Sequence, residues 1–309
     1  MKKLSFLISC LLIVVLINLL YNYQPSYYKE SRLQMGTVVE VTVPNQRVAE
    51  LVFARIAELE NKLSIYKPES EISRLNKEGR AVVSPDTLEL IQLAKKYYYL
   101  TEGNFDVTVL PLSKLWGLKG KNKVDKIPQQ AEIDAVLPLI GCDKIIINES
   151  NRQVSFEKAG MEIDLGGIAK GFVVDEAIKI LKSNGVKSAL VVAGGDMYCL
   201  GKKGSKFWHV GIRNPQGAGV IKELNLENAA ITTSGGYERF VTIQEKKFCH
   251  IINPKNGYPL EDINSSATVI ADSCVVADIL STTLFIVKNE QAAAIAKRCG
   301  IREYFISRH

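Results

Sequence analysis

The chain has 309 residues, 47% of them hydrophobic, which is enough for one large domain or two modest ones with a sizeable core. Its formal net charge is +6, but no cluster of lysines and arginines is interleaved with aromatic residues, which argues against a nucleic-acid-binding protein. The six cysteines form no Cys-x-x-Cys pair, so we interpret them as isolated small hydrophobic residues.

The first predicted element is a segment typical of export. Lys2 and Lys3 precede an apolar run over residues 4–20, which would span roughly 25 Å as a helix, at the lower limit for crossing a bilayer. Positive residues before such a run keep the N-terminus in the cytoplasm and send the rest of the chain outward. We therefore expect a signal or membrane anchor at 1–20, a polar linker at 21–32 and a folded domain at 33–309, on the extracytoplasmic (periplasmic) side of the cytoplasmic membrane.

Three interpretations of this leader stay open. It could be a cleaved signal peptide, although no small-x-small cleavage site follows Leu20. It could be a lipoprotein signal, because Leu7-Ile8-Ser9-Cys10 is similar to a lipobox, although the apolar run continues through Cys10. We favour the third interpretation, an uncleaved signal anchor. All three place the domain outside the cytoplasm and at a membrane.

Apolar periodicity predicts the elements that follow in the first half. They are a strand at 36–43, a helix at 48–63, a turn or short helix at 70–76, a helix at 86–99, a helical segment at 129–140 and a hairpin at 144–157. Residues 119–128 are predicted to form a basic surface loop.

Strands dominate the second half. The predicted elements are strands at 188–192, 208–213, 219–226, 230–233, 266–271 and 302–307, a hairpin within 238–252, and helices at 275–287 and 291–298. Many hairpins in mixed order predict an α+β fold, with mixed or antiparallel sheets and packed helices, rather than a doubly wound parallel sheet.

A glycine-rich stretch, Asp164-Leu-Gly-Gly-Ile-Ala-Lys-Gly171, lies between a predicted strand at 152–163 and an amphipathic run at 172–181. Glycine lets a ligand approach the backbone closely, and free amides at a helix start attract anions such as phosphate. Asp164 and Lys170 add one charge of each sign. A tight turn whose aspartate caps the helix explains the same pattern, and the two interpretations stay open.

Asp278 and Thr282 are four residues apart on a predicted helix, with Ser281 beside them, so their oxygens share a face. A carboxylate and hydroxyls suit a hard cation such as Mg²⁺. A capping aspartate and a threonine bonded to its own helix would give the same spacing. His250, within the predicted hairpin, is a candidate acid or base, or alternatively a half-buried strand residue.

A series of short motifs over residues 35–306 resembles, in order, the ApbE family of FAD:protein FMN transferases. Besides the glycine-rich stretch, the matching motifs are Met35-Gly36-Thr37, Leu63-Ser64-Ile65-Tyr66, Phe105-Asp106-Val107-Thr108, Leu115-Trp116-Gly117, Ala193-Gly194-Gly195-Asp196, Thr233-Ser234-Gly235, His250-Ile251-Ile252-Asn253-Pro254, Gly257-Tyr258-Pro259 and Ala277-Asp278-Ile279-Leu280-Ser281-Thr282. No single motif is specific, but their combination in order is.

The resemblance implies roles for individual residues. It assigns the FAD pocket to Met35, Tyr66, Asn104, Phe105, Asp106, Asp164, Lys170 and Ile252. It assigns Mg²⁺ to the Asp278 helix, with Ser281 and Thr282, and to the main-chain carbonyl of Gly167. His250 is implied as the catalytic residue. One departure is Asn253, where similar proteins usually carry an aspartate, and we expect its amide to support a charged imidazole less well than a carboxylate.

The function implied is Mg²⁺-dependent transfer of FMN from FAD to a Thr or Ser hydroxyl of a partner redox protein, with release of AMP. The implied acceptors are exported flavoprotein subunits such as those of Nqr- or Rnf-type complexes. No Gly-x-Gly-x-x-Gly fingerprint follows a strand, which fits FAD as a substrate rather than a redox cofactor. Two alternatives are an FAD pyrophosphatase and a non-catalytic, membrane-tethered flavin-binding protein.

Overall fold

The computed structural model describes residues 26–120, 124–261 and 263–308. The predicted leader at 1–20 and the beginning of the predicted linker lie outside the described residues. Within these ranges, no helix has the length and apolar character needed to span a bilayer.

The centre of the molecule is a seven-stranded sheet in the order β1-β2-β6-β7-β10-β13-β14, in which every neighbouring pair is antiparallel. Its strands are β1 (Tyr28–Gln34), β2 (Thr37–Val43), β6 (Ala189–Ala193), β7 (Asp196–Leu200), β10 (Ala229–Gly235), β13 (Ser266–Ala271) and β14 (Glu303–Ser307). The prediction of an α+β fold with antiparallel sheets is confirmed.

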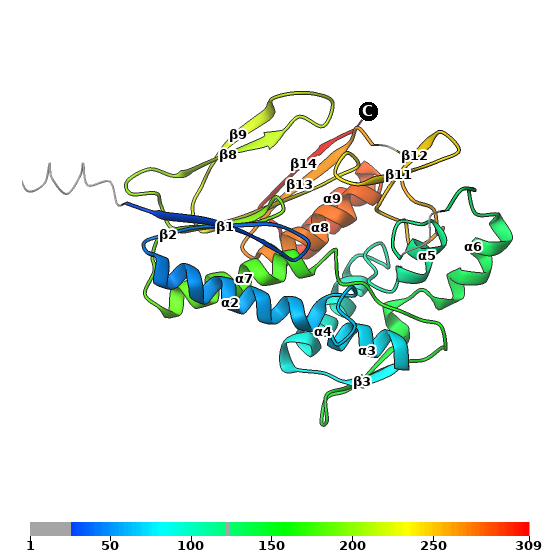
Figure 1. Ribbon diagram of the computed structural model, residues 1–309. Coiled ribbons are helices and arrows are strands. Elements are labelled where there is room, and N and C mark those ends of the chain that lie inside the picture. The colour runs from blue at the N-terminus through cyan, green and yellow to red at the C-terminus, as the bar shows by residue number, and fades with distance from the viewer. Residues whose placement is uncertain (1–25, 121–123, 262, 309) are drawn as a thin grey trace, which may run out of the picture.

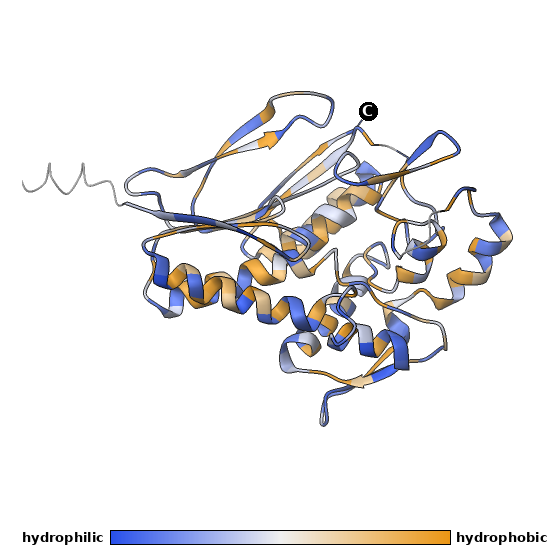
Figure 2. Ribbon diagram, in the orientation of Figure 1, coloured by the Kyte–Doolittle hydropathy of each residue, from blue (hydrophilic) through white to orange (hydrophobic). Residues whose placement is uncertain are grey.

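Helices cover one face of this sheet and a hairpin lies over the other (Figure 1). The helices are α2 (Gln46–Leu63), α7 (Ala169–Ser183), α8 (Cys274–Ile286) and α9 (Asn289–Cys299), and the hairpin is β8 (Trp208–Arg213) with β9 (Val220–Leu226). Figure 2 shows polar and apolar residues mixed along α2 but mostly apolar residues in α8. α8 contacts β10, β13, α7 and α9, which explains why it is buried on most sides.

A second, mainly helical lobe packs below the sheet (Figure 1). It contains α3 (Glu71–Glu78), α4 (Pro85–Leu100), α5 (Leu110–Leu115), α6 (Gln130–Val136), the 3₁₀ turns η1 (Leu137–Leu139) and η2 (Cys142–Lys144), and a small sheet of β3 (Arg80–Val82), β5 (Gln153–Phe156) and β4 (Ile145–Asn148). A further hairpin, β11 (Phe240–Ile243) with β12 (Lys246–Cys249), lies near α5 and α6. The predicted helix at 129–140 is thus α6 followed by the 3₁₀ turn η1.

The predicted strand at 152–163 is too long, because β5 ends at Phe156. Beyond it the chain turns, with the Met161 amide donating to the Lys158 carbonyl at 3.3 Å. Ile163 then bonds through both its amide and its carbonyl to the side chain of Asn76, each at 2.8 Å, instead of to a neighbouring strand. The side chain of Asn76 therefore supplies the backbone partners that a strand would have supplied.

The predicted linker at 21–32 is also too long, because β1 begins at Tyr28. Its sequence, YKESRLQ, lacks the apolar alternation that identifies strands, because β1 is an edge strand whose residues are all at least partly exposed. The short strands β3 and β7 were not predicted either. α7 begins at Ala169, three residues before the predicted run at 172–181.

Gly171 allows α7 and α8 to approach closely. A Cβ at this position would lie 2.5 Å from the Cys274 carbonyl oxygen and 2.6 Å from the Val275 Cα, both of them backbone atoms that cannot rotate away. We expect Gly171→Ala to lower the free energy of unfolding by about 1–3 kcal/mol, because overpacking outweighs the gain in helix propensity. Thermal unfolding measures the loss. Ser183→Ala, at an exposed position near the end of α7, is the control, and a Gly171→Ala protein as stable as this control would contradict the close approach.

Candidate active site

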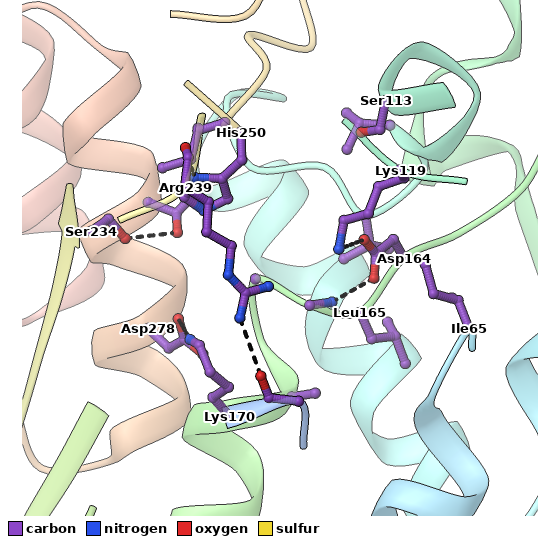
Figure 3. Close-up of a pocket in the computed structure, with 18 of the residues that line it drawn as sticks. Ile65, Ser113, Lys119, Asp164, Leu165, Lys170, Ser234, Arg239, His250 and Asp278 are labelled. Atoms are coloured by element: carbon purple, nitrogen blue, oxygen red, sulfur yellow. Dashed lines mark hydrogen bonds and ion pairs between the residues drawn. The ribbon is translucent and has the colours of Figure 1, made fainter. Parts of the chain in front are cut away.

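A cavity of about 560 Å³ opens where the large sheet, α7, α8 and the second lobe meet. Every predicted site residue except Ser281 lines it, namely Met35, Tyr66, Asn104, Phe105, Asp106, Asp164, Gly167, Lys170, His250, Ile252, Asp278 and Thr282. Ser281 is fully buried, and its hydroxyl donates to the Asp278 carbonyl at 3.0 Å and lies 2.9 Å from Ser234 Oγ. Figure 3 shows charged side chains, among them Lys119, Lys170 and Arg239, pointing into the cavity from different parts of the chain.

The hairpin turn between β1 and β2 forms one edge of the cavity. Gln34 pairs with Thr37, so Met35 and Gly36 form a two-residue loop, and both have positive φ angles, 55° and 67°. These are the angles of a type I′ turn, which suits the twist of an antiparallel pair but is strained for methionine. The turn holds the Met35 backbone at the cavity.

Asp106 and Asn104 shape the wall through bonds to their own loop. Asp106 Oδ1 accepts hydrogen bonds from the Thr108 amide at 2.8 Å and from the Thr108 hydroxyl at 2.6 Å. Burial raises the pKa of the Asp106 carboxyl, although these hydrogen bonds oppose that shift. Asn104 Nδ2 donates to the Thr101 carbonyl at 2.7 Å. Both side chains therefore fix the loop that carries Phe105.

Asp164 does not cap α7, whose N-cap residue is Ile168 and has no side-chain cap bond. Its Oδ1 accepts from the Gly166 amide at 2.9 Å, and its Oδ2 lies 3.1 Å from Lys119 Nζ. Lys119 Nζ also lies 5.5 Å from the centre of the Tyr66 ring, and 68% of Tyr66 is exposed. Burial lowers the pKa of Lys119, but Asp164 and Tyr66 together outweigh burial and the net shift is upward. Lys119 is therefore part of the site and not of the basic surface loop that the sequence predicts.

The start of α7 binds a carboxylate of the protein itself. Asp278 Oδ2 accepts from the Gly171 amide at 3.0 Å, and Lys170 Nζ lies 3.4 Å from Asp278 Oδ1. Lys170 also forms an ion pair with Asp196, the first residue of β7. The anion-binding position predicted for this helix start is thus occupied in part by Asp278, which is 2% exposed on α8, a helix whose residues are mostly buried.

Negative charge is concentrated around Lys170. Burial raises the pKa of Asp196, and the nearby Asp278 carboxylate raises it further. Burial and Asp278 also raise the pKa of Glu238. For Lys170, burial lowers the pKa but the two aspartates outweigh it and raise it. A divalent cation would relieve this repulsion between carboxylates.

The donor set at Asp278 fits Mg²⁺ better than a softer metal. In the described parts of the chain, no three His, Cys, Asp or Glu side chains are grouped as metal ligands. A metal here would instead bind the Asp278 carboxylate, the Thr282 hydroxyl and main-chain or ligand oxygens, which is the oxygen-rich, partly protein-supplied set that Mg²⁺ accepts.

His250 is held as a neutral base. Its Nδ1 lies 3.0 Å from the main-chain carbonyl oxygen of Arg239, an acceptor that requires a proton on Nδ1 and leaves the Nε2 lone pair free. Burial lowers the pKa of His250 to about 4, assisted by the positive charges of Arg239, Lys119 and Lys170. The imidazole is therefore uncharged at neutral pH and can accept a proton.

The expected link between Asn253 and His250 is wrong. Asn253 Oδ1 accepts a hydrogen bond from the Lys255 amide at 3.0 Å, within its own turn. The Arg239 carbonyl holds the imidazole instead. An aspartate or an asparagine at position 253 can make the same turn bond, so the departure at this position leaves the hydrogen bond that orients His250 in place.

Comparison with known proteins agrees with this arrangement. Residues 35–305 match the model of the ApbE family. The chain belongs to the ApbE family. The FAD:protein FMN transferase of Klebsiella pneumoniae is 32% identical over 292 residues, covering 91% of this chain and 90% of the relative. The FAD:protein FMN transferase of Haemophilus influenzae is 31% identical over 278 residues, covering 87% of this chain and 80% of the relative.

Solved ApbE structures share the fold. The ApbE protein of Thermotoga maritima has a TM-score of 0.84 and 31% identity, covering 92% of this chain and 97% of that one. The flavin transferase ApbE of Vibrio cholerae has a TM-score of 0.80 and 28% identity, covering 91% and 93%. The chain is therefore an enzyme of the ApbE family and shares the fold of these structures over most of its length.

Six charged residues of this ApbE site were missed by sequence reasoning: Glu60, Lys67, Lys119, Asp196, Glu238 and Arg239. Asp196 is the last residue of a motif that we had already matched, Ala193-Gly194-Gly195-Asp196. Glu238 and Arg239 closely follow another, Thr233-Ser234-Gly235. These motifs carried the signal, because charged residues directly after glycine turns lie at strand ends. The sequence around Lys119 gave no indication of a role in the site, because a lysine in a polar loop is ordinarily solvated.

Proposed function

We propose that this protein transfers FMN from FAD to a threonine or serine hydroxyl of a partner protein, with release of AMP. The enzyme class follows from its family, whose curated relatives are named FAD:protein FMN transferases. The observation that carries the proposal is a neutral histidine held by a main-chain carbonyl in the same cavity as the Asp278 and Thr282 oxygens. Such a cavity combines a proton acceptor with a site for phosphate-bound metal.

In this reaction His250 Nε2 takes the proton of the acceptor hydroxyl, as a general base. The hydroxyl oxygen forms a bond to the FMN phosphorus, and the bond from that phosphorus to the bridging oxygen breaks. Asp278, Thr282 and the Gly167 carbonyl would hold Mg²⁺, which supplies neutralisation of the diphosphate charge. Lys170 holds the Asp278 side chain in place through their contact at 3.4 Å.

The cavity also supports binding of FAD without a dinucleotide fold. Apolar or aromatic side chains of Met35, Tyr66, Phe105 and Ile252 line it and offer surfaces for flavin and adenine rings. Tyr66 is exposed enough to serve as a stacking platform at the mouth. These surfaces support FAD as the substrate of the site.

An FAD pyrophosphatase would use the same residues, with water in place of the acceptor hydroxyl. Product analysis separates the two activities, because a transferase yields AMP plus protein-bound FMN, whereas a pyrophosphatase yields AMP plus free FMN. A non-catalytic flavin-binding protein would retain unaltered FAD. We propose exported flavoprotein subunits of Nqr- or Rnf-type complexes as the acceptors.

We further propose that the leader exports this domain and holds it at the membrane. Lys2 and Lys3 before the apolar run at 4–20 support this orientation. A C-terminal reporter that is active only in the cytoplasm should stay silent, whereas the same fusion lacking residues 2–20 should be active. A signal from the full-length fusion equal to that of the truncated one would contradict export. If the full-length fusion stays silent, intact-mass analysis of the mature protein distinguishes an uncleaved anchor, a cleaved signal peptide and a lipid on Cys10.

A further inference from the structure

Among the cations that line the cavity, Arg239 differs from the rest in its partners. Three of the four have carboxylate partners, in the pairs Lys67–Glu60, Lys119–Asp164 and Lys170–Asp196. Arg239 has no carboxylate within ion-pair distance among the residues that the structure describes. Its guanidinium instead donates a hydrogen bond of 3.4 Å from Nη2 to the main-chain oxygen of Gly36. Its charge is therefore available to a ligand.

The bond to Gly36 is easily exchanged. A donor–acceptor distance of 3.4 Å is beyond the usual range for N–H···O bonds, and its acceptor is a neutral carbonyl. Phosphate oxygens are charged acceptors, and they bind a guanidinium through two parallel hydrogen bonds. An anionic diphosphate in the cavity would therefore displace Gly36 as the partner of Arg239.

The place of Arg239 suits this exchange. In Figure 3 its guanidinium lies across the cavity, between the side that carries Lys170 and Asp278 and the side that carries Lys119. Its main-chain carbonyl is also the group that orients His250. One residue thus carries a free positive charge in the cavity and fixes the direction of the base.

We propose that the side chain of Arg239 binds the diphosphate of FAD and stabilises the departing AMP. This inference rests on the proposed function. The acceptor oxygen bonds to the FMN phosphorus, the bond from that phosphorus to the bridging oxygen breaks, and its electron pair leaves with AMP. The hydroxyl proton goes to His250, while Arg239 stays protonated and offsets the charge that grows on the AMP phosphate.

Equilibrium binding of FAD and of riboflavin to the full-length protein tests the inference without any turnover. Riboflavin has the flavin ring but no phosphate. We expect Arg239→Gln to weaken FAD binding by roughly 10- to 100-fold, the value of a charged hydrogen-bonding group, and to change riboflavin binding by less than about twofold. Arg239→Lys, which keeps the charge but not the paired donors, should fall between the parent and Arg239→Gln.

Arg213→Gln is the matched control, because Arg213 stacks on Tyr237 at 4.9 Å and does not line the cavity. It should bind FAD as the parent does. Unchanged FAD binding in Arg239→Gln would overturn the inference, and so would an equal loss of FAD and riboflavin binding, which would indicate a distorted cavity.

The outcome is separate from that of the proposed function. If the parent protein transfers no FMN to any acceptor but needs Arg239 to bind FAD over riboflavin, the transferase proposal fails and the diphosphate contact stands. If the parent transfers FMN and Arg239→Gln binds FAD unchanged, only the inference about Arg239 fails. The rate of FMN transfer in single turnovers at saturating FAD tests the contact with AMP. A slower transfer in Arg239→Gln than in the parent supports this contact. An equal transfer rate limits Arg239 to binding and overturns its role in AMP departure.

Discussion

Replacing Asp278 by asparagine should reduce FMN transfer by roughly 10³-fold while leaving the fold intact. Asparagine keeps an oxygen that can accept the Gly171 amide, which the aspartate binds at 3.0 Å, so the junction of α7 and α8 is preserved. It removes the negative charge that the metal requires, and it leaves Lys170 with Asp196 as its carboxylate partner. The measurements are the transfer rate as a function of Mg²⁺ concentration and the thermal midpoint.

The control for this substitution is Asp272→Asn. Asp272 lies six residues earlier, its side chain is 81% exposed and it pairs with Arg302, so its loss should leave transfer unchanged. Full transfer by Asp278→Asn, or transfer by the parent in excess EDTA, would show that the reaction does not need a metal at Asp278.

His250→Ala should slow transfer by roughly 10²- to 10⁴-fold, the usual cost of losing a general base. FAD binding should survive, because the imidazole bonds to the Arg239 carbonyl and the FAD and metal positions are assigned to other side chains. Single-turnover transfer and FAD affinity, measured on the same preparation, separate the two effects. A His250→Ala protein that transfers FMN at the parent rate would exclude His250 from the mechanism.

The pH dependence follows from the same residue. Because the pKa of His250 is lowered to about 4, the base is uncharged through pH 5–6, and kcat/KM should fall only as pH approaches 4 rather than near the ordinary histidine pKa of about 6.5. The unfolded state binds more protons than the folded state between these values, so stability should also decrease as pH falls from about 6.5 to 4. Asn253→Asp should leave the fall of kcat/KM near pH 4 unchanged, because Asn253 bonds to Lys255 and not to the imidazole.

The architecture was predictable where the sequence pattern is strong and local. β13 was predicted with the bounds that it has, because a short continuous run of small and β-branched residues, buried on both faces, ends at the polar pair Asp272-Ser273. β1 was not predicted, because an edge strand of polar residues has no apolar alternation. The strand at 152–163 was overextended because the chain bends and turns after Phe156, and Ile163 bonds to the side chain of Asn76, a contact between residues 87 positions apart. Neither the pairing of β1 at the sheet edge nor the contact with Asn76 can be recognised from the neighbouring residues in the sequence.

The members of the site were predictable, but several of their partners were not. Motif order placed Asp164, Lys170 and Asp278 together, and the structure brings all three to the cavity. Their electrostatic partners depend on tertiary contacts: Lys119 reaches Asp164 from a loop that the sequence marks only as polar. Ser281 illustrates the limit of helical spacing, because it neighbours Asp278 in sequence but bonds to the helix backbone and Ser234 instead of the cavity.

The most direct test of transferase activity is incubation of the purified protein with FAD, Mg²⁺ and a candidate acceptor subunit. Flavin fluorescence of the acceptor on a denaturing gel and the amount of AMP are both measured. We predict fluorescence that stays with the acceptor through denaturation, and AMP equal in amount to the bound FMN. AMP with free FMN and no fluorescent acceptor, for every exported flavoprotein subunit tried, would contradict the transferase and identify a pyrophosphatase.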